Sequence, residues 1–204
     1  GNIDTVGLDL YMKMVDEAVE ELKQDEFKEV FKDLPRQQER SQPTIDTYFE
    51  LGIPNDYMPD QSDRLSFYTT LFTLVKIEEL DEIRDEMKDK FGKPPLVVER
   101  LTQAAVLRFH ASYALLERIV IQKQKIIAVL PKGDRESFYQ NLFVPLLSFI
   151  NSKYSKEIKF VQSNETLKLE INNKYDSPEK VLEFLISFCK EITDVIYKVS
   201  TTQY

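Results

Sequence analysis

Residues that usually build catalytic and metal sites are scarce in this sequence. Among 204 residues there is one histidine, His110, and one cysteine, Cys189. A zinc site needs several converging nitrogen or sulfur ligands and a disulfide needs two cysteines, so the sequence excludes an internal disulfide framework and fits a reducing compartment. We expect His110 to be structural or solvent-facing, and Cys189 to be a small core residue of an apolar helix.

Glycine is also rare, with five residues, and none of them stands in a GxxxxGK[ST] or GxGxxG pattern. The sequence therefore offers no loop of the kind that cradles phosphates, and its acidic pairs do not follow the spacing of a calcium-binding loop. We expect no catalytic, cofactor-binding or metal-binding residue in this chain. A hydrolase that uses carboxylates of the second half remains an alternative, because spacing along a sequence does not give spacing across a cleft.

Long apolar runs are missing as well. No run approaches the roughly 20 apolar residues that a membrane-spanning helix needs. The N-terminal stretch GNIDTVGLDL has neither the basic segment nor the apolar core of a signal peptide. We therefore expect a cytoplasmic protein without a membrane partner. Because the chain begins at Gly1 rather than at methionine, we expect it to be part of a longer protein.

Positive charge is in short supply in the first half. The net charge is −8, but residues 1–100 hold 24 acidic and 13 basic residues, whereas residues 101–204 hold 11 and 14. Nucleic-acid affinity comes largely from cations that neutralise phosphates, so we expect no direct nucleic-acid binding, and the absence of tryptophan agrees with this. An acidic surface suits a basic patch on a protein, although solubility alone would also explain it.

Apolar periodicity predicts a mainly helical first half. The predicted elements are a helix over Thr5–Leu22, a linker over Leu34–Thr44, a strand over Ile45–Leu51, a helix capped by Asp60 or Ser62, a helix over Ile77–Phe91 and a helix from Pro95 to about Tyr113–Leu116. Gly92 supplies the left-handed residue that ends the helix Ile77–Phe91, and Pro94–Pro95 prevents its continuation.

Tight turns and β-branched residues predict hairpins in the second half. The predicted elements are a hairpin over Arg118–Leu130, a helix from about Glu136 to Ile150 with Pro145 as a kink or boundary, a hairpin over Glu157–Ile171 that turns at Ser163–Asn164, and a last helix opened by Ser177–Pro178–Glu179. The predicted fold class is therefore α+β: a helical front half of about four helices and one short strand, followed by a ββαββα antiparallel unit.

The helix Ile77–Phe91 carries negative charge where a helix tolerates it poorly. Glu78, Glu82, Asp85 and Asp89 fall opposite its apolar stripe. Asp89 in the last turn costs ~0.3–1 kcal/mol against the helix dipole. A Glu86–Lys90 pair at i, i+4 spacing offsets part of this cost. The remaining penalty is small enough to be tolerated without a function, so helix energetics alone does not identify a site.

Two stretches resemble the C-terminal part of the bacterial transcription-repair coupling factor family. PNDYMPDQSDRLSFY follows that family's pattern P-[DN]-D-[YF]-[IM]-P-D-x-x-x-R-L-x-x-Y, and EELDEIRDEMKDKFGKPP follows its pattern E-L-x-E-[IL]-x-x-E-[LM]-x-D-[RK]-F-G-x-x-P. The two motifs stand in the family's order and at its separation. The similarity extends over about Asp4–Arg108 and fades over Phe109–Tyr204.

The resemblance implies that the parent protein is an ATP-driven DNA translocase that removes stalled RNA polymerase and recruits excision repair. The ATPase motifs, with their ATP and magnesium, would lie upstream of this chain. Residues 1–44 would be a helix and linker that follow the motor, and residues 45–204 a non-catalytic regulatory domain. That domain would dock on the N-terminal module of the same polypeptide and cover the surface that recruits the damage-recognition subunit.

Carried over by position, the family's docking contacts fall on Glu86, Asp89 and Lys90. The resemblance implies an arginine-rich partner surface, which suits the acidic front half. Lys90 stands where many relatives have arginine, and lysine cannot make a planar bidentate contact. A free-standing acidic scaffold that binds a basic partner in trans is the second hypothesis.

Overall fold

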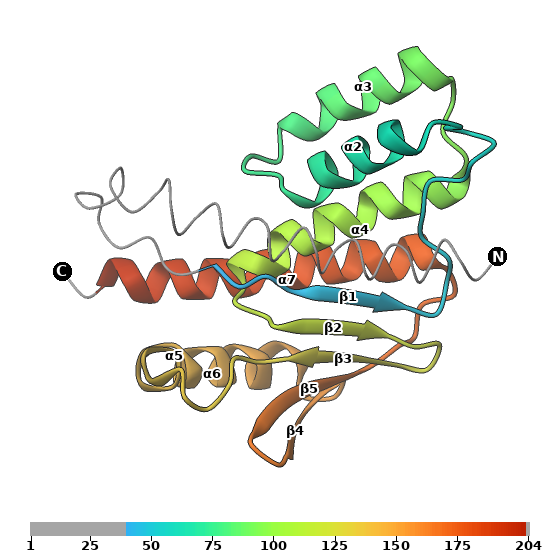
Figure 1. The fold of residues 1–204 in the computed structure, drawn as a ribbon. Coiled ribbons are helices and arrows are strands. Elements are labelled where there is room, and N and C mark those ends of the chain that lie inside the picture. Colours follow the sequence, from blue (N-terminus) through green and yellow to red (C-terminus); the bar gives the residue numbers. More distant parts are fainter. Residues whose placement is uncertain (1–39, 203–204) are drawn as a thin grey trace. The chain divides into compact units, whose positions relative to one another are not determined.

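The computed structural model describes residues 40–202, and within them the chain forms two compact units (Figure 1). Unit 1 comprises residues 50–105, and unit 2 comprises residues 40–49 and 106–202. The predicted helix Thr5–Leu22 and most of the predicted linker Leu34–Thr44 lie outside the described residues.

Unit 1 is helical. It contains α2 (Gln61–Phe72), α3 (Glu79–Phe91) and the first part of α4 (Leu96–Tyr113). Side chains from all three helices and from the loop before α2 form its core, and the largest of them are Met58, Leu71, Met87 and Leu101. The predicted stripe on α3 is confirmed for Leu80, Ile83 and Met87, which are buried. Unit 1 thus presents the opposite, charged face of α3 to solvent.

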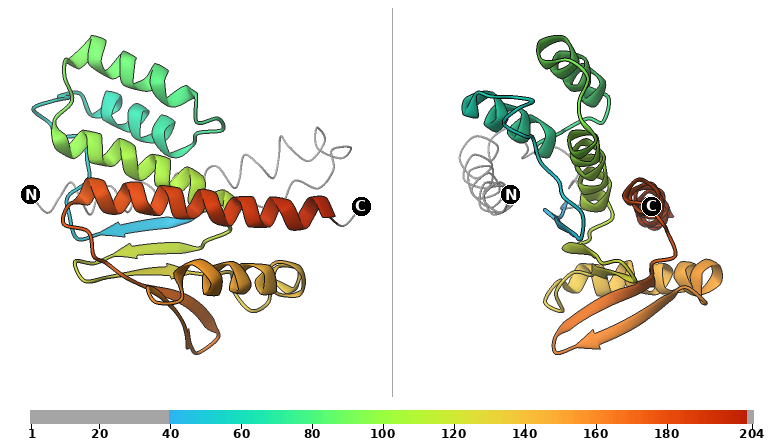
Figure 2. Two further views of the ribbon diagram at one scale, coloured as in Figure 1. Left: turned by 180° about the vertical axis from the view of Figure 1, so that it is seen from behind. Right: turned by 90° about the vertical axis from the view of Figure 1, so that its right-hand side faces the viewer.

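Unit 2 is built on a five-stranded sheet with the order β1-β2-β3-β5-β4. The strands are β1 (Thr44–Thr47), β2 (Arg118–Ile121), β3 (Lys125–Val129), β4 (Ile158–Ser163) and β5 (Thr166–Asn172). The helices are α5 (Glu136–Asn141), α6 (Phe143–Tyr154) and α7 (Pro178–Thr202), and Figure 2 shows the long α7 from behind and end-on. Alternate strand residues such as Ile119, Ile126 and Leu169 are fully buried, as period-2 alternation requires.

The predicted α+β class is confirmed, and both predicted hairpins form. The predicted helix Glu136–Ile150 is instead two helices that meet at Leu142, and Pro145 lies in the first turn of α6, where its missing N–H costs nothing. The second hairpin turns at Asn164–Glu165, one residue later than predicted, because Asn164 takes the positive φ of 56°. The predicted strand Ile45–Leu51 ends earlier, at Thr47.

Strand β1 pairs in parallel with β2, which the hairpin pattern did not indicate. The segment before β1 is fixed to the C-terminal end of α4. The guanidinium of Arg40 stacks 4.0 Å from the ring centre of Tyr113, and its Nε and Nη2 atoms donate to Ser112 Oγ at 3.2 and 3.0 Å. Ser41 Oγ donates to the Leu116 carbonyl oxygen at 2.5 Å. These contacts hold the entry to β1 against the helix end.

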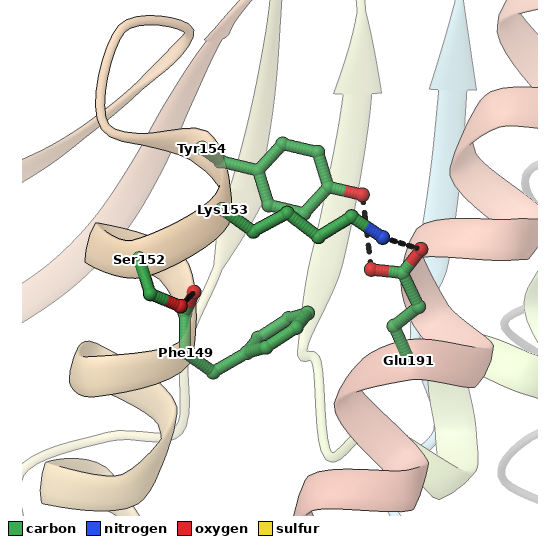
Figure 3. A network of polar contacts seen from close by, with 5 residues as sticks. All are labelled: Phe149, Ser152, Lys153, Tyr154 and Glu191. Carbon is green, nitrogen blue, oxygen red and sulfur yellow. Dashed lines mark hydrogen bonds and ion pairs between the residues drawn. The ribbon is translucent and has the colours of Figure 1, made fainter.

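A polar network joins α6 to α7 (Figure 3). The Glu191 carboxylate accepts from Lys153 Nζ at 2.7 Å and from the Tyr154 hydroxyl at 3.0 Å. Burial and this carboxylate together raise the pKa of Tyr154 well above its ordinary value, so the phenol stays a proton donor. Cys189, two residues before Glu191 on α7, is fully buried, and burial raises the pKa of its thiol. The predicted core role of Cys189 is confirmed.

His110 lies on α4 in unit 2, half-buried, with its ring edge-on to Phe109 at 5.1 Å between centroids. Burial, with a smaller effect of Lys190, lowers the pKa of His110 from 6.5 to about 4. The native state therefore keeps this imidazole neutral at a pH where the unfolded chain binds a proton.

We expect the free energy of unfolding to fall as the pH drops from about 6.5 towards 4, because the unfolded state takes up a proton that native His110 refuses. Chemical denaturation of the wild type and of His110→Gln at pH 7 and pH 4.5 measures this. Carboxylates titrate in both proteins and cancel in the comparison. The stability advantage of the wild type should be larger at pH 7; an equal difference at both pH values would contradict the assignment.

Candidate partner-binding site

The loop before α2 fixes the place where α3 ends. The Tyr57 hydroxyl lies 2.9 Å from the Gly92 carbonyl oxygen and 3.3 Å from the Met87 carbonyl oxygen, so its one hydrogen serves the last turn of α3. The ring of Phe91 lies 6.0 Å from that of Tyr57 and, edge-on, 6.0 Å from that of Phe67. Burial raises the pKa of Tyr57, which keeps its hydroxyl a donor.

The rest of the first motif builds the loop that carries Tyr57. Asp60 caps α2 and accepts from the backbone N–H of Ser62 at 2.7 Å. Arg64 reaches back from α2, and its Nη1 donates to the carbonyl oxygens of Met58 at 2.7 Å and Pro59 at 2.9 Å. Met58 itself is fully buried. The residues of the first motif therefore act in the structure as a scaffold for the end of the second.

Gly92 ends α3 with a backbone that other residues rarely adopt. Its φ is 81° and its ψ is −168°, and its N–H donates to the Lys88 carbonyl oxygen at 2.9 Å. The predicted positive φ is confirmed, but the ψ places Gly92 in a region that is essentially restricted to glycine, outside the left-handed helical region that asparagine also tolerates. After the turn, the Pro95 carbonyl oxygen accepts from Val98 and Glu99 and begins α4.

The exposed face of α3 is acidic, and little of that charge is neutralised. Within the described residues, two ion pairs form on the helix, from Arg84 to Asp81 at 3.9 Å and from Lys90 to Glu86 at 2.7 Å. Acidic side chains at the start of the helix, such as Glu79 and Glu82, lie favourably near the positive end of its dipole.

Asp89 stands at the unfavourable end of α3. Its side chain is exposed, and no residue of the described part of the chain forms an ion pair or hydrogen bond with it. Lys90, one residue on, is engaged with Glu86, and this hydrogen bond raises the pKa of the Lys90 ammonium. The predicted Glu86–Lys90 pair is thus confirmed as an intrahelical contact. Among the described residues, the Asp89 carboxylate is therefore unpaired, whereas the Glu86 carboxylate is paired with Lys90.

The structure brings the three sequence-predicted residues Glu86, Asp89 and Lys90 together on one exposed helix end. Such a site can attract and hydrogen-bond a cationic group, but it has no enclosed reactive geometry. Across residues 40–202, no cluster of histidine, cysteine and acidic side chains could hold a metal ion, and no helix meets the length and hydropathy of a membrane span. Tyr57 and Arg64, which position the site, stand in the first motif, but no local pattern in the sequence assigns them this role.

Comparisons with known proteins point to one family. The TRCF domain family matches residues 47–141. A Bacillus subtilis protein named transcription-repair-coupling factor is 30% identical over 196 residues, which is 96% of this chain but 16% of that protein. A Staphylococcus haemolyticus protein of the same name is 33% identical over 144 residues, 70% of this chain and 12% of its own length. The chain therefore spans a small part of these relatives.

A solved structure agrees on the fold. The crystal structure of the C-terminal domain of transcription-repair coupling factor superimposes with a TM-score of 0.62 and covers 82% of this chain and 99% of that one. The sequences of the two are 15% identical, so this likeness concerns the fold.

We expect Tyr57→Phe to lower the free energy of unfolding by about 0.5–1.5 kcal/mol, because it removes the donor to the Gly92 carbonyl oxygen. Amide hydrogen exchange should also speed up in the last turn of α3. Tyr48→Phe is the matched control, since the Tyr48 hydroxyl has no hydrogen-bond partner among the described residues. Equal effects of the two substitutions would argue against Tyr57 as the residue that fixes the helix end.

We expect Gly92→Ala to cost about 1–3 kcal/mol through backbone strain alone, because a Cβ at this position meets no atom within 4 Å. Gly92→Asn should not restore stability, since ψ lies outside the region that asparagine tolerates. Thermal or denaturant unfolding measures both. Gly133→Ala, where a Cβ makes an ordinary contact of 3.9 Å, should be nearly neutral. A neutral Gly92→Ala would show that the strain is absent.

Proposed function

The chain belongs to the transcription-repair coupling factor family, and from this premise we propose that it is the non-catalytic, autoinhibitory part of a DNA translocase that couples removal of stalled RNA polymerase to nucleotide excision repair. It docks through the end of α3 on the N-terminal module of the same polypeptide. Docked there, it masks the surface to which the damage-recognition subunit binds. The contacts are Glu86, Asp89 and Lys90.

The observation that carries this proposal is the exposed and partly uncompensated acidic end of α3. Asp89 opposes the helix dipole and has no partner among residues 40–202, while Tyr57 and Gly92 hold the turn that presents it. A helix end of this kind gains most from a cationic partner. Arginine suits it best, because a guanidinium binds a carboxylate through two parallel hydrogen bonds.

The three contacts are not equivalent. Asp89 can accept an incoming guanidinium directly. Glu86 already accepts from Lys90 at 2.7 Å, so a partner must share or displace that lysine. Both side chains of this pair are more than half exposed, and exposed ion pairs contribute little to stability, so the exchange costs little. Lys90 is therefore the weakest of the three contacts.

The remaining partners of the proposal belong to the longer protein. ATP and magnesium act in a motor upstream, and this chain needs no cofactor of its own. RNA polymerase and DNA contact other regions of the parent. The acidic first half agrees with a domain that does not itself bind nucleic acid, and the proposed location is the cytoplasm.

A free-standing acidic scaffold that binds a basic partner in trans is the second candidate. The same α3 surface would serve it, and the reading frame around this chain distinguishes the two. A start codon near Gly1 without an upstream motor would favour the scaffold.

We expect the double variant Glu86→Gln/Asp89→Asn to weaken binding of this chain to the N-terminal module of its parent, as measured by isothermal titration calorimetry. If both carboxylates are desolvated against arginines, the loss should be a few kcal/mol; at an open rim it should stay under about 1 kcal/mol.

The control is Glu183→Gln/Asp194→Asn, which makes the same charge change at two exposed positions of α7 in unit 2. It should bind like the wild type. Equal affinities for all three proteins would reject α3 as the docking surface, whereas equal weakening by both variants would indicate a general charge effect.

A further inference from the structure

Strand β4 is the open edge of the sheet in unit 2. It ends the strand order β1-β2-β3-β5-β4, and among residues 40–202 it pairs with β5 alone. With six residues it is longer than β1, the four-residue strand at the other end. An open strand edge presents a row of unpaired backbone donors and acceptors to any extended chain.

The turn fixes which residues face outward. Ser163 and Thr166 flank the two-residue turn Asn164–Glu165, so they form a hydrogen-bonded pair, and the pairs alternate from there along the strand. This alternation predicts a hydrogen-bonded pair at Glu157 and Asn172. The Asn172 N–H does donate to the Glu157 carbonyl oxygen, at 3.1 Å. The backbone groups of the intervening residues therefore point away from β5: Ile158, Phe160 and Gln162. No described residue bonds to them. Ile158 is only 4% exposed, so Phe160 and Gln162 provide the accessible part of this edge.

Side chains on the two faces of β4 define what could lie beside it. On one face Phe160 is half-buried, with its ring 6.2 Å from that of Phe143, and offers an apolar neighbour. On the other face Lys159 is exposed and Val161 is 36% exposed. A strand added here would place alternate residues beside Phe160 and beside Lys159.

The charge of the edge selects an acidic occupant. Within the described residues neither Lys156, just before β4, nor Lys159 has an ion-pair partner, whereas Glu157 is held by Lys174 at 2.8 Å. Glu170 lies across from Lys159 on β5, one strand inward, and Glu165 lies in the turn. The strand itself thus carries unpaired positive charge only.

Lysine at this position also opposes a second copy of the chain. Two β4 edges joined in antiparallel fashion would bring their exposed lysines near one another, which disfavours self-pairing. Lys159 therefore disfavours pairing with a second copy and favours pairing with a strand of opposite charge.

We propose that β4 is a docking edge for an extended acidic segment of a partner protein, which adds to the sheet as a sixth strand with alternating apolar and acidic residues. Backbone groups of Phe160 and Gln162 bind its main chain. Lys159 pairs with an acidic side chain and Phe160 packs on an apolar one. This edge is in unit 2 and is independent of α3.

The full 204-residue chain, isotopically labelled, is titrated with an acetylated and amidated hexapeptide of alternating valine and glutamate. We expect shifts of the backbone amide signals of Phe160 and Gln162 at micromolar to millimolar peptide, and none with a hexapeptide of alternating valine and lysine. No shift with the acidic peptide up to millimolar concentration, or shifts confined to other residues, would overturn the proposal.

Gln162→Pro removes an outward N–H without removing a bond to β5, so the fold is retained. It should weaken binding at least about tenfold relative to Gln162→Ala. Lys159→Glu should transfer the preference to the lysine peptide. Unchanged binding by Gln162→Pro or an unchanged preference of Lys159→Glu would overturn the assignment. A concentration-dependent dimer that Gln162→Pro abolishes would assign the edge to a second copy instead.

Discussion

The bond from the Tyr57 hydroxyl to the Gly92 carbonyl oxygen is the contact on which the α3 surface depends. It ties the loop before α2 to the turn after α3, at the point where Gly92 adopts a backbone that needs glycine. Arg64 and Asp60 hold the loop at one side of this bond, and Phe91 packs at the other. The two sequence motifs thus form one set of contacts. Together they fix the position of the acidic end of α3 on the surface.

Much of the fold followed from local patterns. Periodicity placed α3 because Leu80, Ile83 and Met87 recur at helical spacing and are buried. Asp60 was one of two candidate caps of α2, and it is the residue that caps it. The hairpins were predictable because their turns lie between β-branched runs that pair with near neighbours.

Non-local features could not be predicted in this way. Nothing in the pattern of Ile45–Leu51 indicates that β1 pairs in parallel with β2, about seventy residues away, or that Arg40 stacks on Tyr113 to hold it there. At the α3 surface, composition supplied the acidic face and the family resemblance supplied Glu86, Asp89 and Lys90. The role of Tyr57 could be seen only in the structure. Its hydroxyl donates to a carbonyl oxygen of a helix 30 residues later, and such a contact leaves no local signal in the sequence. The interface role of the three residues is still a prediction.

The proposed autoinhibition predicts a measurable change in the basal activity of the longer protein. The basal rate of ATP hydrolysis or DNA translocation by the parent, measured without RNA polymerase, should be compared between the intact protein and one that ends before residue 40. If this domain docks on the N-terminal module as proposed, removal of residues 40–204 should raise the basal rate. An unchanged basal rate in a protein that still folds and binds DNA would contradict the account.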